Sequence, residues 1–63
     1  MKIKQGDYLE MMGGRAFEVL DGESWDGISG ELTLVEVDEN NNHIGKAFDY
    51  EITISSPIRD VIR

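Results

Sequence analysis

The clearest alternation of hydrophobic and polar residues covers positions 48–55. A period of two residues over such a stretch is typical of a β-strand with one buried face. We expect the apolar side to face the core and the acidic side to face water. The apolar positions are Phe48, Tyr50, Ile52 and Ile54, and the polar ones are Asp49, Glu51, Thr53 and Ser55.

A β-hairpin is predicted near the start of the chain. Two strand-like runs, 7–12 and 15–20, are separated by Gly13-Gly14. A two-residue turn needs positive φ at its central positions, which glycine adopts readily. This turn would set Glu10 opposite Phe17.

The middle of the chain predicts a loop, a strand and a polar tip. Residues 21–27 contain two Asp-Gly steps without periodicity, which favours a loop. Residues 28–38 form a strand whose inward-facing set changes near positions 34–35, as a bulge or sharp bend would cause. Residues 40–43 make a polar tip, where asparagine tolerates a left-handed backbone.

The end of the chain is short. Ser56-Pro57 suits the start of a helix, and Ile58, Val61 and Ile62 would then share one helical face. A short final strand is the alternative. Residues 1–63 are expected to form a single, mostly β domain. The predicted fold is a small SH3-like barrel of four or five short bent strands with a short C-terminal helical turn, and an open sheet with one terminal helix is second.

Composition removes most kinds of chemistry. The chain has no cysteine and one histidine, so thiol chemistry and thiolate metal sites are excluded. A domain of 63 residues rarely encloses the cleft that paired catalytic carboxylates need. Residues 38–49 resemble a calcium loop in oxygen spacing, but His43 stands where that loop needs glycine. We therefore expect no enzyme, no metal and no cofactor.

Charge is the feature that changes the picture most. Thirteen acids and six bases give a net charge of −7. Between residues 5 and 58, twelve acids face only Arg15 and Lys46, so that stretch carries −10. Duplex backbone is bound by several basic side chains, so direct nucleic-acid binding is not expected. The sequence lacks a long apolar run or a secretion signal, which predicts a cytoplasmic protein without a membrane segment.

The acids also suggest a surface for a partner. Side chains on one face of a strand lie about 6.6–6.8 Å apart, so rows of carboxylates could imitate a nucleic-acid strand. Trp25 lies among acids, and tryptophan is enriched at binding hot spots. The alternatives are that the acids are simply solvated and that Trp25 caps the core. The candidate partner-binding residues are Trp25, Asp21, Glu23, Asp26, Glu36, Asp38, Asp49 and Glu51.

Two segments carry a family resemblance. Gly6-Asp7-Tyr8-Leu9-Glu10 resembles the opening strand of KOW-type SH3-like barrels, and residues 25–38 are similar to the following Gly-rich stretch of that motif. The resemblance covers residues 6–38 and implies a small barrel. The chain departs from it by the Gly13-Gly14 hairpin and by lacking basic loops. It is also loosely similar to small acidic inhibitor proteins of phages.

Three functions follow from these observations. The first is a non-enzymatic acidic protein that docks on a basic, nucleic-acid-handling protein, most concretely a phage or mobile-element inhibitor that blocks nucleic-acid access. The second is a KOW-like adaptor of the transcription or translation machinery, using Lys2, Lys4, Arg59 and Arg63. The third is a structural subunit of a virion or other assembly, with homodimer formation through the 48–54 strand.

Overall fold

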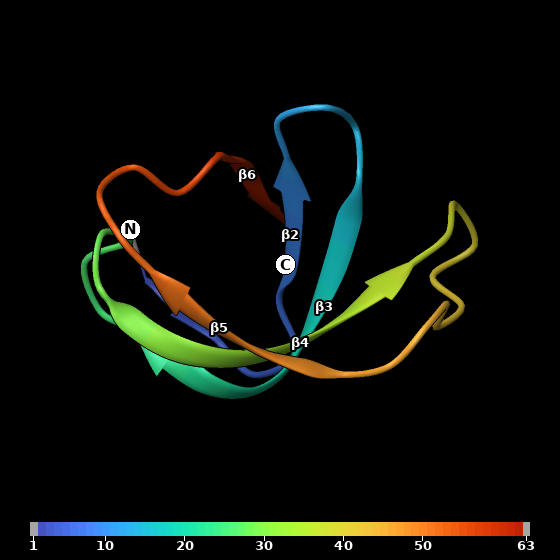
Figure 1. Cartoon of the computed structure of the whole chain (residues 1–63), viewed down its shortest axis with the longest axis horizontal. Coiled ribbons are helices and arrows are strands. Elements are labelled where there is room, and N and C mark those ends of the chain that lie inside the picture. The colour runs from blue at the N-terminus through green and yellow to red at the C-terminus, as the bar shows by residue number, and fades with distance from the viewer. Residues whose placement is uncertain (1, 63) are drawn as a thin grey trace.

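Six antiparallel strands form one sheet in the computed structural model, which describes residues 2–62. The strand order is β5-β4-β3-β2-β6, and β1 pairs with β3 off this path. Figure 1 shows the sheet strongly curved, with the β2–β3 hairpin rising above β4 and β5. The strands are β1 (Ile3–Lys4), β2 (Tyr8–Met11), β3 (Ala16–Ser24), β4 (Gly30–Val37), β5 (Phe48–Ile52) and β6 (Ile58–Ile62).

The long strand β3 bends the sheet. Its first half pairs with β2, its second half pairs with β1, and β4 pairs along both halves. The register between β3 and β4 shifts between Val19 and Asp21. At this point Val19 donates its N–H to the Asp7 carbonyl at 2.8 Å, and its own carbonyl accepts the N–H of Gly6 at 2.9 Å. The corner between β1 and β2 is therefore fixed to the bend in β3.

The hydrophobic core lies inside this curvature. Its fully enclosed members include Ile3, Leu9, Val19 and Leu34, which have no exposed surface. Val35 and Val37 are also buried but lie outside that cluster. Leu34 and Val35 are both buried, so the buried face does change at positions 34–35. The predicted bulge at these positions is wrong, because β4 pairs with β3 in regular register from Leu34 to Val37, and the shift lies on β3, opposite Thr33 and Leu34.

The predicted β2–β3 hairpin forms, with a different turn. Gly14 donates its N–H to the Met11 carbonyl at 3.1 Å, and Met11 donates to the Arg15 carbonyl at 2.8 Å. The loop therefore has three residues instead of two, and Leu9 pairs with Phe17. A shift of one residue moves side chains to the other face. The predicted pairing of Glu10 with Phe17 is wrong, and both Leu9 and Phe17 enter the core.

The mostly β class is confirmed, but three details of the predicted fold are wrong. Residues 21–24 belong to β3 instead of a loop, because β1 and β4 pair with them on both sides. Residues 58–62 form β6 instead of a helical turn, because the free edge of β2 offers a full ladder. The sheet is open and does not support a closed barrel, because β5 and β6 pair with β4 and β2 only.

The predicted strand at 48–55 is shorter than its alternation. β5 ends at Ile52, whose side chain is buried in the core. Ile54, two residues beyond the end of the strand, is 81% exposed. Phe48 at the other end is 40% exposed. The polar tip before β5 is confirmed: Asn41 has a φ of 64°, and the tip projects from the sheet in Figure 1.

At Gly22, β3 passes close to the backbone of β4. The φ of Gly22 is +90°, and a Cβ atom added there would lie 2.2 Å from the Glu31 carbonyl oxygen. Gly13 has a similar φ of +105°, but an added Cβ would meet nothing within 4 Å. The bend in β3 therefore requires glycine for its space as well as for its backbone angle.

We predict that Gly22→Ala lowers the free energy of unfolding by at least about 2 kcal/mol, from backbone strain plus the clash with β4. Gly13→Ala, the matched control, should lose only about 1 kcal/mol from the left-handed backbone. Urea denaturation followed by tryptophan fluorescence measures both. Equal losses in the two variants would show that the close approach has no energetic weight.

Candidate functional site

Five carboxylates share the outer face of strands β3, β4 and β5. The strand register places them in two rows, with Glu23, Glu31 and Glu51 directly across from one another. In the second row Thr33 lies between Asp21 and Asp49, and its hydroxyl is 3.5 Å from an Asp49 carboxylate oxygen. We call this surface the acidic face; it consists of Asp21, Glu23, Glu31, Asp49 and Glu51.

Glu31 occupies the most repulsive position of the acidic face. It lies opposite Glu23 on one side and opposite Glu51 on the other. Side chains directly opposite in an antiparallel pair have Cβ atoms about 4.5–5.5 Å apart, and like charges there are destabilising. Within residues 2–62, no lysine, arginine or histidine nitrogen lies within 4.0 Å of any of the five carboxylates. Lys4, across from Glu23, is the one described base in register with these rows, so the fold keeps a concentrated negative charge that is only partly offset at one end.

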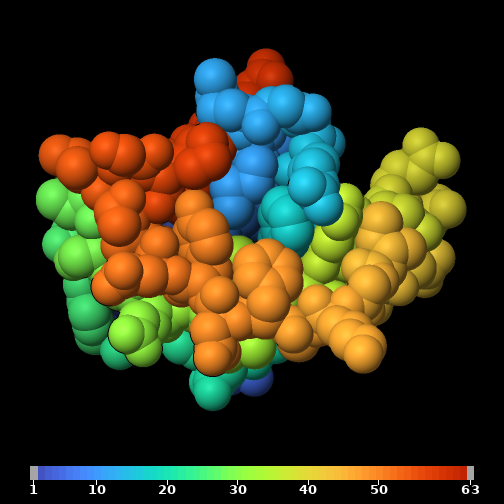
Figure 2. Space-filling view, in the orientation of Figure 1, coloured from blue at the N-terminus to red at the C-terminus, as the bar shows by residue number. Residues whose placement is uncertain are grey.

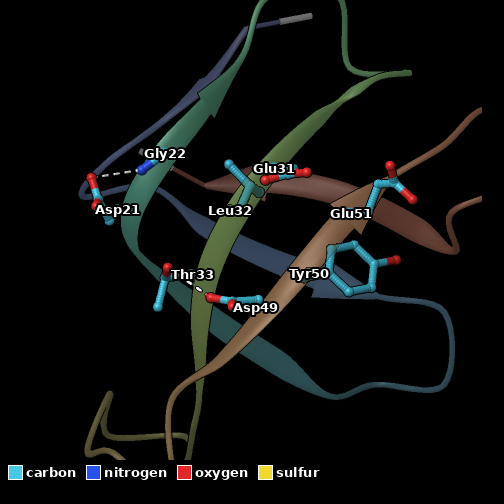
Figure 3. A pocket seen from close by; sticks show the side chains of 8 residues that line it. All are labelled: Asp21, Gly22, Glu31, Leu32, Thr33, Asp49, Tyr50 and Glu51. Carbon is cyan, nitrogen blue, oxygen red and sulfur yellow. Dashed lines mark hydrogen bonds between the residues drawn. The ribbon is translucent and has the colours of Figure 1, made fainter.

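The acidic face is hollowed. Four of its acids, together with Gly22, Leu32, Thr33 and Tyr50, line an open depression of about 520 Å³. Figure 3 shows the Glu31 carboxylate on the side of β4 that faces Glu51, while Asp21 lies at the far side on β3. A convex group carrying positive charge would contact several carboxylates there at once.

Glu36 is placed away from this surface and is already paired. Arg15 donates to both of its carboxylate oxygens, at 2.6 and 3.1 Å. The hydrogen bond from Arg15, with its charge, holds the pKa of Glu36 below the ordinary value. The Arg15 guanidinium also lies over the Phe17 ring, 5.6 Å from its centroid.

Asp26 and Asp38 each hold a loop together. The Asp38 carboxylate accepts the N–H groups of Asn42 and Asn40 at 3.0 and 2.9 Å, and these bonds lower its pKa. Asp26 accepts the N–H of Ile28 at 3.0 Å and bonds to the hydroxyl of Ser29, which lowers its pKa in the same way. Both carboxylates therefore stabilise the turns that contain them.

Trp25 stands on the surface instead of over the core. It is 68% exposed and follows directly after β3, whose last residue, Ser24, is buried. The Lys2 ammonium lies 3.8 Å from the centroid of the Trp25 ring. Such a cation–π contact shows that this ring attracts a positive group while much of it stays in water.

The structure therefore divides the candidate residues. It gathers Asp21, Asp49 and Glu51 around the hollow. Glu23 lies in the same row as Glu51 but outside the lining of the hollow. Sequence reasoning missed Glu31, because its neighbours lie on other strands. The one available signal was its place two residues before Thr33 on a strand with apolar residues at alternate positions.

Comparison with protein-family models, curated protein sequences and solved structures finds no match to this chain. Among residues 2–62, none belongs to a helix with the length and hydrophobicity needed to cross a membrane. In the same residues, no group of three or more histidine, cysteine or acidic side chains is arranged to hold a metal ion.

We predict that Glu31→Gln stabilises the protein by about 0.5–1 kcal/mol at low ionic strength, because two cross-strand repulsions disappear. Added salt should shrink this gain, since exposed charges are screened. Glu39→Gln, which removes the same charge from an exposed turn, is the control. A gain of the same size in both variants would mean that net charge alone is responsible.

The lowered pKa of Asp38 predicts a pH-dependent effect of Asp38→Asn. The folded pKa lies below the ordinary value of 3.8, so the ionised carboxylate stabilises the fold above that value. This contribution disappears as pH falls through the folded pKa. Urea denaturation should therefore show a destabilised variant near neutral pH that converges with the wild type in acid. A difference that persists unchanged below about pH 2 would contradict this linkage.

Proposed function

We propose that this chain is a non-enzymatic binding protein that docks its acidic face on a basic, nucleic-acid-handling protein. The observation that carries the proposal is the set of five carboxylates on three adjacent strands, none of which has a lysine, arginine or histidine nitrogen of residues 2–62 within 4.0 Å, although Lys4 lies across from Glu23 at the end of one row. Acids that only keep a protein dissolved gain nothing from lying directly across from one another, where they repel.

The arrangement suits a site that normally holds a nucleic-acid strand. Acids two residues apart on one strand are separated by about 6.6–6.8 Å, and adjacent strands lie about 4.7–4.9 Å apart. The partner's lysines and arginines would meet carboxylates in place of phosphates, and the field of the acidic body would speed the encounter. Trp25 adds an exposed aromatic anchor beyond the end of β3. An inhibitor from a phage or mobile element that blocks nucleic-acid access is the most concrete form of this function.

The KOW-like adaptor stays a prediction without added support. Of its four bases, Lys2 covers Trp25, and Lys4 pairs across from Glu23. Arg59 has its Nε 3.8 Å from a Glu10 carboxylate oxygen, and Arg63 lies outside the described residues. The three described bases thus each lie beside an acid or an aromatic ring, which does not favour a basic patch.

The test is affinity capture from a nuclease-treated bacterial lysate with two tagged variants of equal charge. The first carries Gln at Glu23, Glu31 and Glu51; the second carries Glu10→Gln, Glu39→Gln and Asp60→Asn. Each changes the net charge from −7 to −4, since −7 + 3 = −4. We expect wild type and the second variant to retain a basic nucleic-acid-binding protein that salt releases, and the first variant to lose it.

The captured protein, once purified, should lose its nucleic acid in competition with wild type but not with the first variant. Equal capture by both variants would show that the acidic face is not the docking surface. Capture that ignores salt would remove electrostatic steering from the mechanism.

A further inference from the structure

Strand β5 has one unused edge. It pairs with β4 over its whole length, and no other described strand pairs with it. Among residues 2–62, no backbone hydrogen bond from another segment reaches Phe48–Ile52 on the far side. In Figure 2 this segment, in orange, faces the viewer with nothing lying over it. An exposed edge presents unpaired N–H and C=O groups and can accept another strand.

The two faces of β5 lead to two different surfaces. Asp49 and Glu51 belong to the acidic face, whereas Phe48 and Tyr50 line a second, mostly apolar hollow of about 240 Å³. The β2–β3 hairpin, strand β4 and the segment before β6 complete this hollow with Met11, Met12, Arg15, Phe17, Leu34 and Pro57. Met12 is 65% exposed at its rim.

We propose that the free edge of β5 binds an extended segment of the partner in which basic and apolar residues alternate. Residues directly across from each other in a ladder share one face of the sheet. Basic side chains of the added strand would therefore extend the acidic rows beyond Asp49 and Glu51. The apolar side chains would lie beside Phe48 and Tyr50 and enter the apolar hollow. The basic character of this segment rests on the function proposed above.

Charge argues against a second copy of this chain at the same edge. Two β5 strands paired antiparallel about Tyr50, with both acidic faces on one side, set Asp49 of each copy against Glu51 of the other. Like charges directly opposite destabilise such a pair. Charged residues on an edge strand are also a known protection against self-association. The charges along the β5 edge therefore oppose pairing with a second copy of this chain and favour a strand that carries basic residues.

The other edge of the sheet lacks these features. β6 is also unpaired on one side among the described strands, but it carries one base, Arg59, and one acid, Asp60, and contributes no residue to either hollow. A basic strand there would meet no excess of acid and no apolar recess. The proposal is therefore specific to β5.

The test uses three labelled synthetic heptapeptides and the full chain. In the first peptide, lysine and valine alternate. The second peptide has the same composition, with all lysines in one block and all valines in the other. The third peptide has the sequence of the first, but the backbone nitrogens along one edge are methylated and cannot donate hydrogen bonds. We expect the first to bind at least about tenfold more tightly than either of the others, because only it offers both the side-chain pattern and the N–H donors. Fluorescence anisotropy measures the affinities.

Amide hydrogen exchange locates the peptide. Slower exchange within residues 48–52 on adding the first peptide supports the proposal, and slower exchange within 58–62 overturns it. Equal binding of the methylated peptide overturns strand addition, and equal binding of the block peptide overturns the alternation. Sedimentation of the chain alone must show a monomer; a dimer protected at β5 would place a second copy there instead.

The two proposals fail separately. If all three peptides bind weakly while the three-glutamine variant still loses the captured protein, the edge is not the site and the acidic face remains one. If the first peptide slows hydrogen exchange at β5 while both charge variants capture the same protein, strand addition at the β5 edge is supported and the proposed function is wrong.

Discussion

The fold depends on the two-for-one register shift between Val19 and Asp21 of β3. Before the shift, the odd-numbered residues Phe17 and Val19 face the core; after it, the even-numbered Ser24 is buried while Glu23 is exposed. A strand that kept its alternation would turn Asp21 and Glu23 inward. The same irregularity that bends the sheet therefore creates half of the acidic face. Gly22 allows it, because β4 passes where a side chain would otherwise stand.

Sequence alone could predict the elements whose pattern is local. Alternation identified β5 and the outward position of Asp49 and Glu51, and the apolar positions of residues 28–38 indicated that the inward-facing set of β4 changes near 34–35. It failed at residues 21–24, where Asp-Gly-Glu-Ser is typical of a loop but pairing on two sides imposes a strand. At residues 58–62 a helical turn was preferred and a short strand was the alternative, because five residues with a helical spacing also fit the vacant edge of β2. The pairing of Glu31 with Glu51 depends on the register between β4 and β5, which the sequence of either strand alone does not give.

The acidic side chains of this chain differ in whether they have a basic or hydrogen-bonding partner. Glu36 pairs with Arg15, Glu18 lies 2.7 Å from His43, and Asp26 and Asp38 close their own turns. These contacts occupy the basic side chains and hydrogen-bond donors that lie near these four acids. The acidic face receives none of the described bases, although Lys4 lies across from Glu23 on the neighbouring strand. A charge excess kept only for solubility would not need to concentrate on one sheet face, where repulsion opposes folding.

The size of the chain explains why the acidic face has an apolar neighbour. A domain of 63 residues buries only about 60% of the surface that its unfolded chain exposes. The buried core draws residues from strands β1 to β5, and at one end it opens into the hollow between Met12, Phe48 and Pro57. Strand β5 lies between this hollow and the carboxylates: Asp49 and Glu51 line the acidic hollow, Phe48 lines the apolar one, and Tyr50 lines both. One strand edge therefore joins the two kinds of surface, polar and apolar, that a specific interface combines in its rim and centre.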